Sequence, residues 1–120
     1  MVKRNIVHIE IPTTDAKASG EFYGKLFGWH IEHDEAMNYT MFDPHVAPGG
    51  GFTDQMKVGE VLIHVNSEDI EADLKKAVAL GGSIVSEKSE IPGIGWWGVF
   101  KDPTGNSIAL FTSLMPGGNQ

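Results

Sequence analysis

Three side chains in this sequence could carry proton-transfer or metal chemistry: His8, Glu10 and His64. In the run 5–11, aliphatic residues at 7, 9 and 11 alternate with His8 and Glu10, so a strand there would project both titratable groups from one face. A second alternating run, 60–66, has aliphatic residues at 61, 63 and 65, and His64 lies on its other face. A histidine near a carboxylate titrates close to neutral pH and can serve as a general acid or base.

The same three residues allow four interpretations, which the sequence leaves open. A His64–Glu10 pair could transfer protons while His8 orients a substrate oxygen. Two imidazoles and a carboxylate could bind zinc or iron, but alternate strand residues project about 7 Å apart, which is wide for two ligands of one ion. The groups could also form a hydrogen-bonded network supporting a cleft, or help a cleft to bind a compound without turning it over.

The runs that contain His8 and His64 each begin a similar series of elements. After the first run, N-cap oxygens around Asp15 predict a helix over 16–27 that Gly28 ends. After the second run, Asp69 caps a helix that starts at Ile70 and closes at the glycine pair 81–82. Further strands are predicted at 29–35, 38–43, near Phe52, and at 83–87, 96–101 and 107–112.

This order predicts an internal duplication with an offset of 54 residues, which relates Asp15 to Asp69 and Glu10 to His64. We predict one domain over 1–120, with a first module of about 1–56, a second of about 57–114 and a flexible tail at 115–120. The fold class is α+β. Two half-sheets would have their aliphatic faces covered by the helices and would share a cleft between their other faces.

The first predicted helix has two faces of interest. A stripe at helical spacing is expected to be its apolar face, consisting of Ser19, Phe22, Tyr23, Leu26 and Phe27. Gly20 and Gly24 share another face, which either admits a close neighbour or is a poorly optimised solvent face. The segment 47–51, with three consecutive glycines, is expected to be a loop or turn.

Composition narrows the classes of function. The chain has 120 residues, 9 basic against 16 acidic side chains, a net charge of −7 and no cysteine. This balance argues against nucleic-acid binding and against anionic lipid surfaces. The absence of cysteine excludes disulfides and cysteine-based metal sites. With no visible signal peptide or membrane-spanning run, we expect a cytoplasmic protein whose partner is a small molecule.

The order of these motifs resembles the vicinal oxygen chelate superfamily, which includes glyoxalase I, extradiol dioxygenases and the bleomycin and fosfomycin resistance proteins. The resemblance covers nearly the whole chain and is closest to small glyoxalase-like members. It is carried by Asn5–Pro12, Asp15, Phe22-Tyr23 and Phe27-Gly28-Trp29, and by Asp69–Ala72, Gly81-Gly82, Ile91-Pro92-Gly93, Gly95-Trp96 and Asp102–Asn106. It implies two paired βαβββ modules whose curved sheets enclose a cleft, and it allows a homodimer.

The resemblance also implies where metal ligands would lie. The family's first histidine falls on His8, but the ligand that opens the second module falls on Leu62 and the glutamate of the last strand falls on Ala109. The remaining glutamate would lie near 49–52, where no carboxylate is present. We therefore expect no cofactor and no glyoxalase I activity, with His8 as the only retained family-type ligand.

These inferences lead to two hypotheses. The first is a glyoxalase-like protein that binds a small organic molecule in the cleft between the modules, without the usual metal. Its expected ligand-binding residues are Leu62, Trp96, Trp97, Ala109 and Phe111. The second is an enzyme of lyase, isomerase or dioxygenase type, which would use His8, Glu10 and His64 either as acid and base groups or as atypical ligands of a divalent metal ion.

Overall fold

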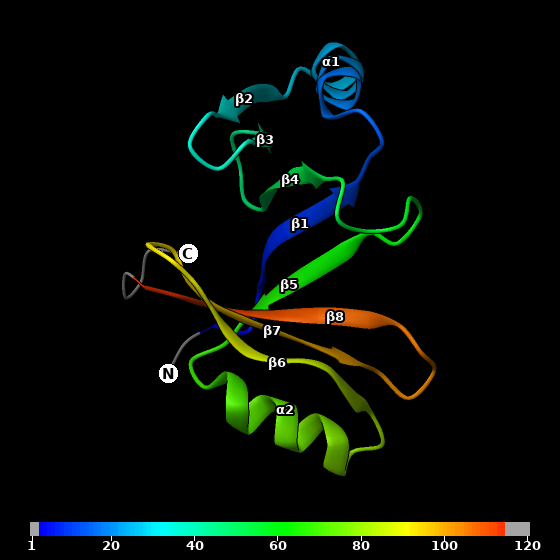
Figure 1. Ribbon diagram of the computed structural model, residues 1–120, viewed down its shortest axis with the longest axis vertical. Coiled ribbons are helices and arrows are strands. Elements are labelled where there is room, and N and C mark those ends of the chain that lie inside the picture. The colour runs from blue at the N-terminus through cyan, green and yellow to red at the C-terminus, as the bar shows by residue number, and fades with distance from the viewer. Residues whose placement is uncertain (1–2, 115–120) are drawn as a thin grey trace. The chain divides into compact units, whose positions relative to one another are not determined.

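The computed structural model describes residues 3–114, which fall into two compact units. The first unit runs from His8 to Leu62, and the second takes the chain from Ile63 onward together with the initial segment up to Val7. Strands and helices alternate as β-α-β-β-β twice along the chain, as Figure 1 shows. The α+β fold of two βαβββ modules is confirmed, whereas the predicted tail at 115–120 lies outside the described residues.

The first module has the strand order β2-β3-β4-β1, with α1 packed against β2, β3 and β4. Strands β1 and β4 are parallel, and the two other pairs are antiparallel. Its elements are β1 (Ile6–Pro12), α1 (Ala16–Phe27), β2 (His30–Asp34), β3 (Tyr39–Asp43) and β4 (Gly49–Thr53).

The predicted helix boundaries are confirmed at both ends of α1. The Asp15 side chain accepts a hydrogen bond from the backbone N–H of Ala18, which satisfies one of the unpaired donors of the first turn. Gly28 has a φ of 74°, and its N–H bonds to the carbonyl of Gly24. This left-handed conformation is the one that glycine adopts at helix C-termini.

The face that α1 turns toward the sheet differs from the predicted stripe. Phe22, Leu26 and Phe27 are more than half exposed, whereas Gly20 is buried. A β-carbon at Gly20 would lie 2.9 Å from Cγ2 of Ile31. Gly20 and Gly24 therefore leave room for the Ile31 side chain. Because the glycine face of α1 packs against the sheet, most of the aromatic stripe faces away from it.

The glycine run at 49–51 is strand rather than loop, which corrects the sequence prediction. Gly49, Gly50 and Gly51 all belong to β4. A β-carbon at Gly50 would overlap the carbonyl oxygen of Ile9, and one at Gly51 would overlap the phenol of Tyr39. The absence of side chains at these positions lets neighbouring groups come close, a requirement that local strand propensity does not reveal.

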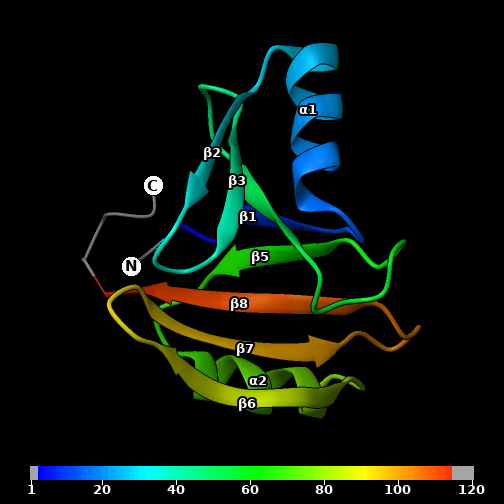
Figure 2. The same cartoon turned by 45° about the horizontal axis from the view of Figure 1, so that its top comes forward.

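The second module repeats the arrangement with the strand order β5-β8-β7-β6. A core of Ile70, Leu74 and Leu110 joins α2 to the sheet, as seen where α2 lies along these strands in Figure 2. Its elements are β5 (Leu62–Asn66), α2 (Ile70–Ala79), β6 (Ser83–Ile91), β7 (Gly95–Lys101) and β8 (Ser107–Ser113).

The segment before β1 is tied to the second module. Arg4 forms an ion pair with Asp73 at 2.6 Å and donates to the carbonyl oxygen of Asn66 at 2.9 Å. The backbone N–H of Asn66 donates in turn to the carbonyl oxygen of Asn5.

Neither helix in the described part of the chain has the length and apolar character needed to cross a membrane.

Candidate functional site

The first module holds a cluster of three titratable side chains: His8, Glu10 and Tyr39. Nε2 of His8 lies 2.6 Å from Oε1 of Glu10 and 3.0 Å from the hydroxyl of Tyr39. The Tyr39 hydroxyl donates to the same carboxylate oxygen at 2.6 Å. Each distance is within hydrogen-bond range, so the three groups form a closed triangle.

Strand alternation places this cluster on the face of the sheet that α1 does not cover. Phe42 and Phe52 point toward α1, where they belong to an aromatic group with Tyr23 and Trp29. Tyr39 lies three residues before Phe42, and Glu10 lies one residue before Ile11, the register partner of Phe52. Their side chains therefore project from the opposite face.

Tyr39 reaches Glu10 because the intervening strand has no side chain in its path. Strand β4 lies between β3 and β1, and Gly51 is the register partner of Glu10. A β-carbon at Gly51 would overlap the Tyr39 hydroxyl. Gly51 is thus the position that lets a phenol on β3 cross β4 and bond to a carboxylate on β1.

Burial and the neighbouring carboxylate both keep the Tyr39 phenol protonated. Burial raises the pKa of Tyr39 well above its ordinary value of 10.0, and the negative charge of Glu10 and its hydrogen bond raise it further. The side chains of His8 and Glu10 are 32% and 15% exposed. Solvent therefore reaches the imidazole of His8 more readily than the carboxylate of Glu10.

Strand alternation in the sequence correctly predicts that His8 and Glu10 share a face, but Tyr39 is absent from the site residues predicted from the sequence. Strand alternation predicts that side chains 8 and 10 project from the strand about 7 Å apart. In the structure they bend toward each other, and Nε2 of His8 lies 2.6 Å from Oε1 of Glu10. Two signals could have pointed to Tyr39: its strand parity, opposite to that of Phe42, and the glycine at position 51 of the neighbouring strand.

The second module has its own helix-free face, which carries His64. His64 is paired in register with Ala109, and Ala109 with Val99, so the three residues form a row across β5, β8 and β7. Trp97 and Phe111 form a further cross-strand pair on this face. The predicted contact between His64 and Glu10 stays a prediction.

Trp96 lies on the other face of β7. It packs against the core of Ile70, Leu74 and Leu110, and the Lys88 ammonium lies 5.4 Å from the centre of its ring. Of the two adjacent tryptophans, Trp97 is therefore the one that shares a face with Phe111.

The positions at which the family resemblance implies metal ligands do not fit a divalent ion. Leu62 and Ala109 are buried hydrocarbon side chains without donor atoms. At Gly51, the space that a liganding side chain would occupy is taken by the Tyr39 phenol. Within residues 3–114, no group of three or more His, Asp or Glu side chains has the geometry to hold an ion.

Comparisons with known proteins agree with this architecture. A model of the glyoxalase-like domain matches residues 7–111. The anthracycline biosynthesis protein DnrV of Streptomyces peucetius is 25% identical over 122 residues, which cover 85% of this chain and 44% of DnrV. CFP32 of Mycobacterium bovis, named as a candidate glyoxylase, is 25% identical over 124 residues, which cover 86% of this chain and 43% of CFP32. The chain thus spans less than half the length of these curated relatives.

Solved structures show the same fold. A Streptomyces coelicolor methylmalonyl-CoA epimerase superposes with a TM-score of 0.63 and 20% identity, covering 92% of this chain and 95% of that one. A glyoxalase/bleomycin resistance protein/dioxygenase superfamily member from Vibrio splendidus 12B01 gives a TM-score of 0.61 and 14% identity, covering 92% of this chain and 100% of that one. The chain belongs to the glyoxalase-like domain family, within the vicinal oxygen chelate superfamily.

Proposed function

We propose that this protein binds a small organic molecule through the His8–Glu10–Tyr39 cluster, without a divalent metal ion. The observation that carries the proposal is the closed hydrogen-bonded triangle on the helix-free face of the first module. Three polar side chains that converge from two strands are the kind of small polar group that orients a ligand at an otherwise apolar site.

Each member of the cluster has a distinct role in this proposal. The His8 side chain is more exposed than that of Glu10, so its imidazole makes the contact with the ligand. Glu10 holds the ring of His8, and Tyr39 holds Glu10. The absence of donor atoms at Leu62 and Ala109 supports a site that works without the family's metal. The ligand position between the modules, predicted from the sequence, stays a prediction.

A thermal-shift screen tests the proposal. Daunorubicin and methylmalonyl-CoA are suitable first probes, because the names of related proteins mention anthracycline biosynthesis and methylmalonyl-CoA. A broader set of small organic compounds would follow. We expect a compound that raises the melting temperature of the wild-type protein and that loses most of this effect with His8→Ala and with Glu10→Gln.

His45→Ala is the matched control, since His45 is an exposed histidine of the same module that is outside the cluster. A compound that binds wild type and all three variants equally would place recognition elsewhere. A screen in which no compound stabilises the protein would reject the binding function.

Metal-free proton transfer is the second candidate function. The 2.6 Å contact between Nε2 of His8 and a Glu10 oxygen favours it, because a carboxylate that orients an imidazole is a common arrangement for a general base. The test is exchange of the acidic carbon-bound proton of methylmalonyl-CoA in deuterated water, followed by mass spectrometry. Exchange that needs His8 and persists in His45→Ala would support catalysis, and exchange at the uncatalysed rate would leave a binding protein.

A further inference from the structure

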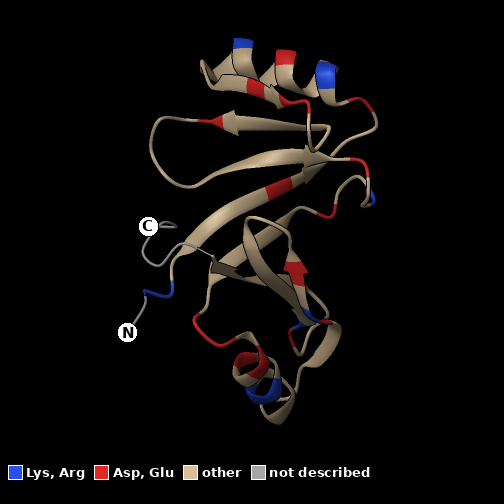
Figure 3. Ribbon diagram, turned by 60° about the vertical axis from the view of Figure 1, so that its left-hand side comes forward, with Lys and Arg blue, Asp and Glu red and all other residues tan. Residues whose placement is uncertain are grey.

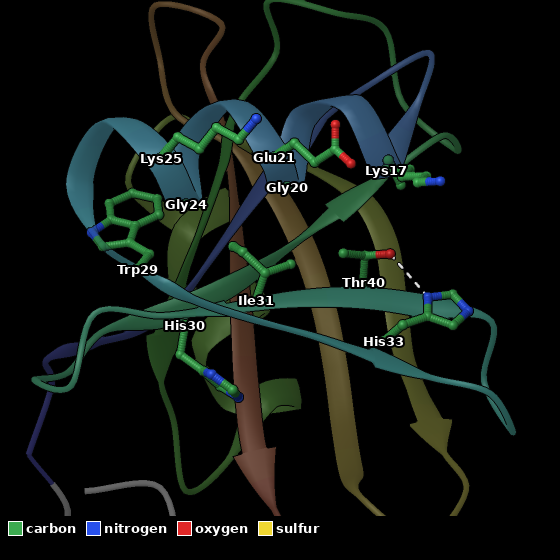
Figure 4. A pocket seen from close by; sticks show the side chains of 11 residues that line it. Lys17, Gly20, Glu21, Gly24, Lys25, Trp29, His30, Ile31, His33 and Thr40 are labelled. Carbon is green, nitrogen blue, oxygen red and sulfur yellow. Dashed lines mark hydrogen bonds between the residues drawn. The ribbon is translucent and has the colours of Figure 1, made fainter.

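A groove lies on the other face of the first module, between α1 and the edge strand β2. The groove has a volume of about 770 Å³, within the range typical of small-molecule sites. The side chains along it are seen in Figure 4. None of the groove's lining residues belongs to the His8–Glu10–Tyr39 cluster, so a ligand here would be separate from the one proposed above.

The floor of the groove is apolar and is kept open by small residues. The side chain of Ile31, a residue of β2, points toward α1 and lies against Gly20 and Gly24. Larger side chains at these helix positions would meet Ile31: a β-carbon at Gly20 would lie 2.9 Å from its Cγ2, and one at Gly24 would lie 3.1 Å from its Cγ1. The half-buried ring of Trp29 continues this apolar surface at one end.

The opposite end of the groove is polar. Lys17 lies there beside Thr40 and His33, as Figure 4 shows. Nδ1 of His33 and the Thr40 hydroxyl are hydrogen-bonded at 3.0 Å, and Nε2 of His33 lies 4.0 Å from a Glu35 oxygen. Each end of the groove thus has a lysine and a histidine: Lys25 and His30 at the Trp29 end, and Lys17 and His33 at the other. The second end differs in lacking an aromatic ring and in having the Thr40 hydroxyl bonded to the imidazole.

The charges along α1 indicate the sign of the group that fits this polar end. Lys17, Glu21 and Lys25 line the groove at intervals of one helical turn, an alternation visible along α1 in Figure 3. Glu21 lies in the middle and would repel an anion there. Lys17 lies at the polar end and would attract one, in a chain whose net charge is −7.

We propose that this groove binds an elongated, amphipathic carboxylate, with the acidic group at Lys17 and His33 and the apolar body along Ile31 toward Trp29. The stretch of α1 from Ala16 to Lys25 is about 13 Å long by helical rise, which suits a medium-length alkyl or aryl acid. Charge complementarity at one end and apolar burial along the rest would together determine the orientation of the ligand.

Titration with octanoate tests this site, with 1-octanol as the uncharged probe of the same chain length. Backbone amide shifts in nuclear magnetic resonance spectra should change in residues 16–25 and 29–33. Lys17→Glu should weaken octanoate binding about tenfold and leave octanol binding unchanged within about twofold. The matched control is Lys25→Glu, which makes the same charge change on the same helix at the Trp29 end and should have a much smaller effect on octanoate.

His8→Ala should bind octanoate as the wild type does, which separates this site from the proposed function of the cluster. No binding at millimolar octanoate, equal losses in Lys17→Glu and Lys25→Glu, or shifts confined to other residues would each overturn the proposal. The melting temperature of each variant, measured in the absence of probe, shows whether the variant is folded.

Discussion

The Tyr39 hydroxyl occupies the space into which a side chain at Gly51 would extend. This relationship explains how residues on β3 and β1 meet although β4 lies between them. A glycine at position 51 and a tyrosine at position 39 depend on each other: the first leaves a gap and the second fills it with a polar ring. The His8–Glu10–Tyr39 cluster rests on this pair.

Gly51→Ala should therefore be destabilising only while Tyr39 is present. In the wild-type background we expect a loss of about 2 kcal/mol in the free energy of unfolding, because the new methyl group displaces a packed ring. In a Tyr39→Ala background the same change should cost less than about 0.5 kcal/mol or stabilise the protein, since alanine is favoured over glycine in a strand interior. Urea unfolding of the four proteins measures this coupling. Equal costs in both backgrounds would show that the two positions are independent.

Tyr39 should make the protein less stable in alkaline solution. Burial and the Glu10 charge raise the pKa of Tyr39 in the folded state above its ordinary value of 10.0. As the pH rises past 10, Tyr39 therefore loses its proton more readily in the unfolded chain than in the folded protein, which favours unfolding. The stabilisation is fully present below pH 10 and is lost as the pH rises further. The stability of the wild type should fall more steeply above pH 10 than that of Tyr39→Phe.

Unfolding curves between pH 8 and 11.5 test this difference, with Tyr23→Phe as the control for loss of a tyrosine outside the cluster. Parallel pH profiles for wild type and Tyr39→Phe would contradict the position of Tyr39 beside a negative charge.

Much of this architecture could be predicted from local sequence. Asp15 and Gly28 at the ends of α1, and Asp69 before α2, mark helix boundaries through local hydrogen bonds and backbone conformation. Alternation likewise placed His8 and Glu10 on one face, and the structure shows their side chains in contact. These features depend on residues close together in the chain.

The remaining features depend on residues that are distant in sequence. The role of Gly51 becomes visible only when Tyr39 is seen across the strand, and Gly20 likewise requires Ile31. The apolar stripe of α1 predicted a buried Phe22, yet that ring is 60% exposed because the glycine face packs instead. Helical periodicity identifies an apolar face but does not say which face can approach a sheet most closely.

Gly20→Ala provides a test of this close approach. A β-carbon at position 20 would lie 2.9 Å from Cγ2 of Ile31, so the wild-type protein should lose about 1 kcal/mol of stability or more. In an Ile31→Ala background the obstruction is absent, and the better helix propensity of alanine should stabilise the protein by up to about 1 kcal/mol. Chemical unfolding, with and without Gly20→Ala in each background, measures the sign of the change in the free energy of unfolding. A stabilising Gly20→Ala in the wild-type background would mean that α1 packs less closely than the structure shows.

Asp102 should give the second module a distinct acid dependence. Hydrogen bonds from the backbone and side chain of Asn106, followed by those from Thr104, lower the pKa of Asp102 from 3.8 to about 2. A carboxyl with a depressed folded-state pKa stabilises the fold above its unfolded value and loses this effect as the pH falls. The stability difference between wild type and Asp102→Asn should therefore be constant above pH 4 and shrink between about pH 4 and 2.

Thermal unfolding over that range measures the difference, and Asp54→Asn serves as a control because Asp54 is an exposed aspartate of the other module. A difference that stays constant down to pH 2 would show that the turn at 102–106 does not depend on the Asp102 charge.

The central claim is that the His8–Glu10–Tyr39 cluster works without a divalent metal ion, and metal stoichiometry tests it most directly. Tag-free protein, purified without chelator and then incubated with stoichiometric Zn²⁺, Ni²⁺, Mn²⁺ or Fe²⁺, would be desalted and its metal content determined by elemental analysis. We expect far less than one ion per chain, with no difference between wild type and His8→Ala. One ion per chain in the wild type, lost in His8→Ala and kept in His45→Ala, would contradict the account.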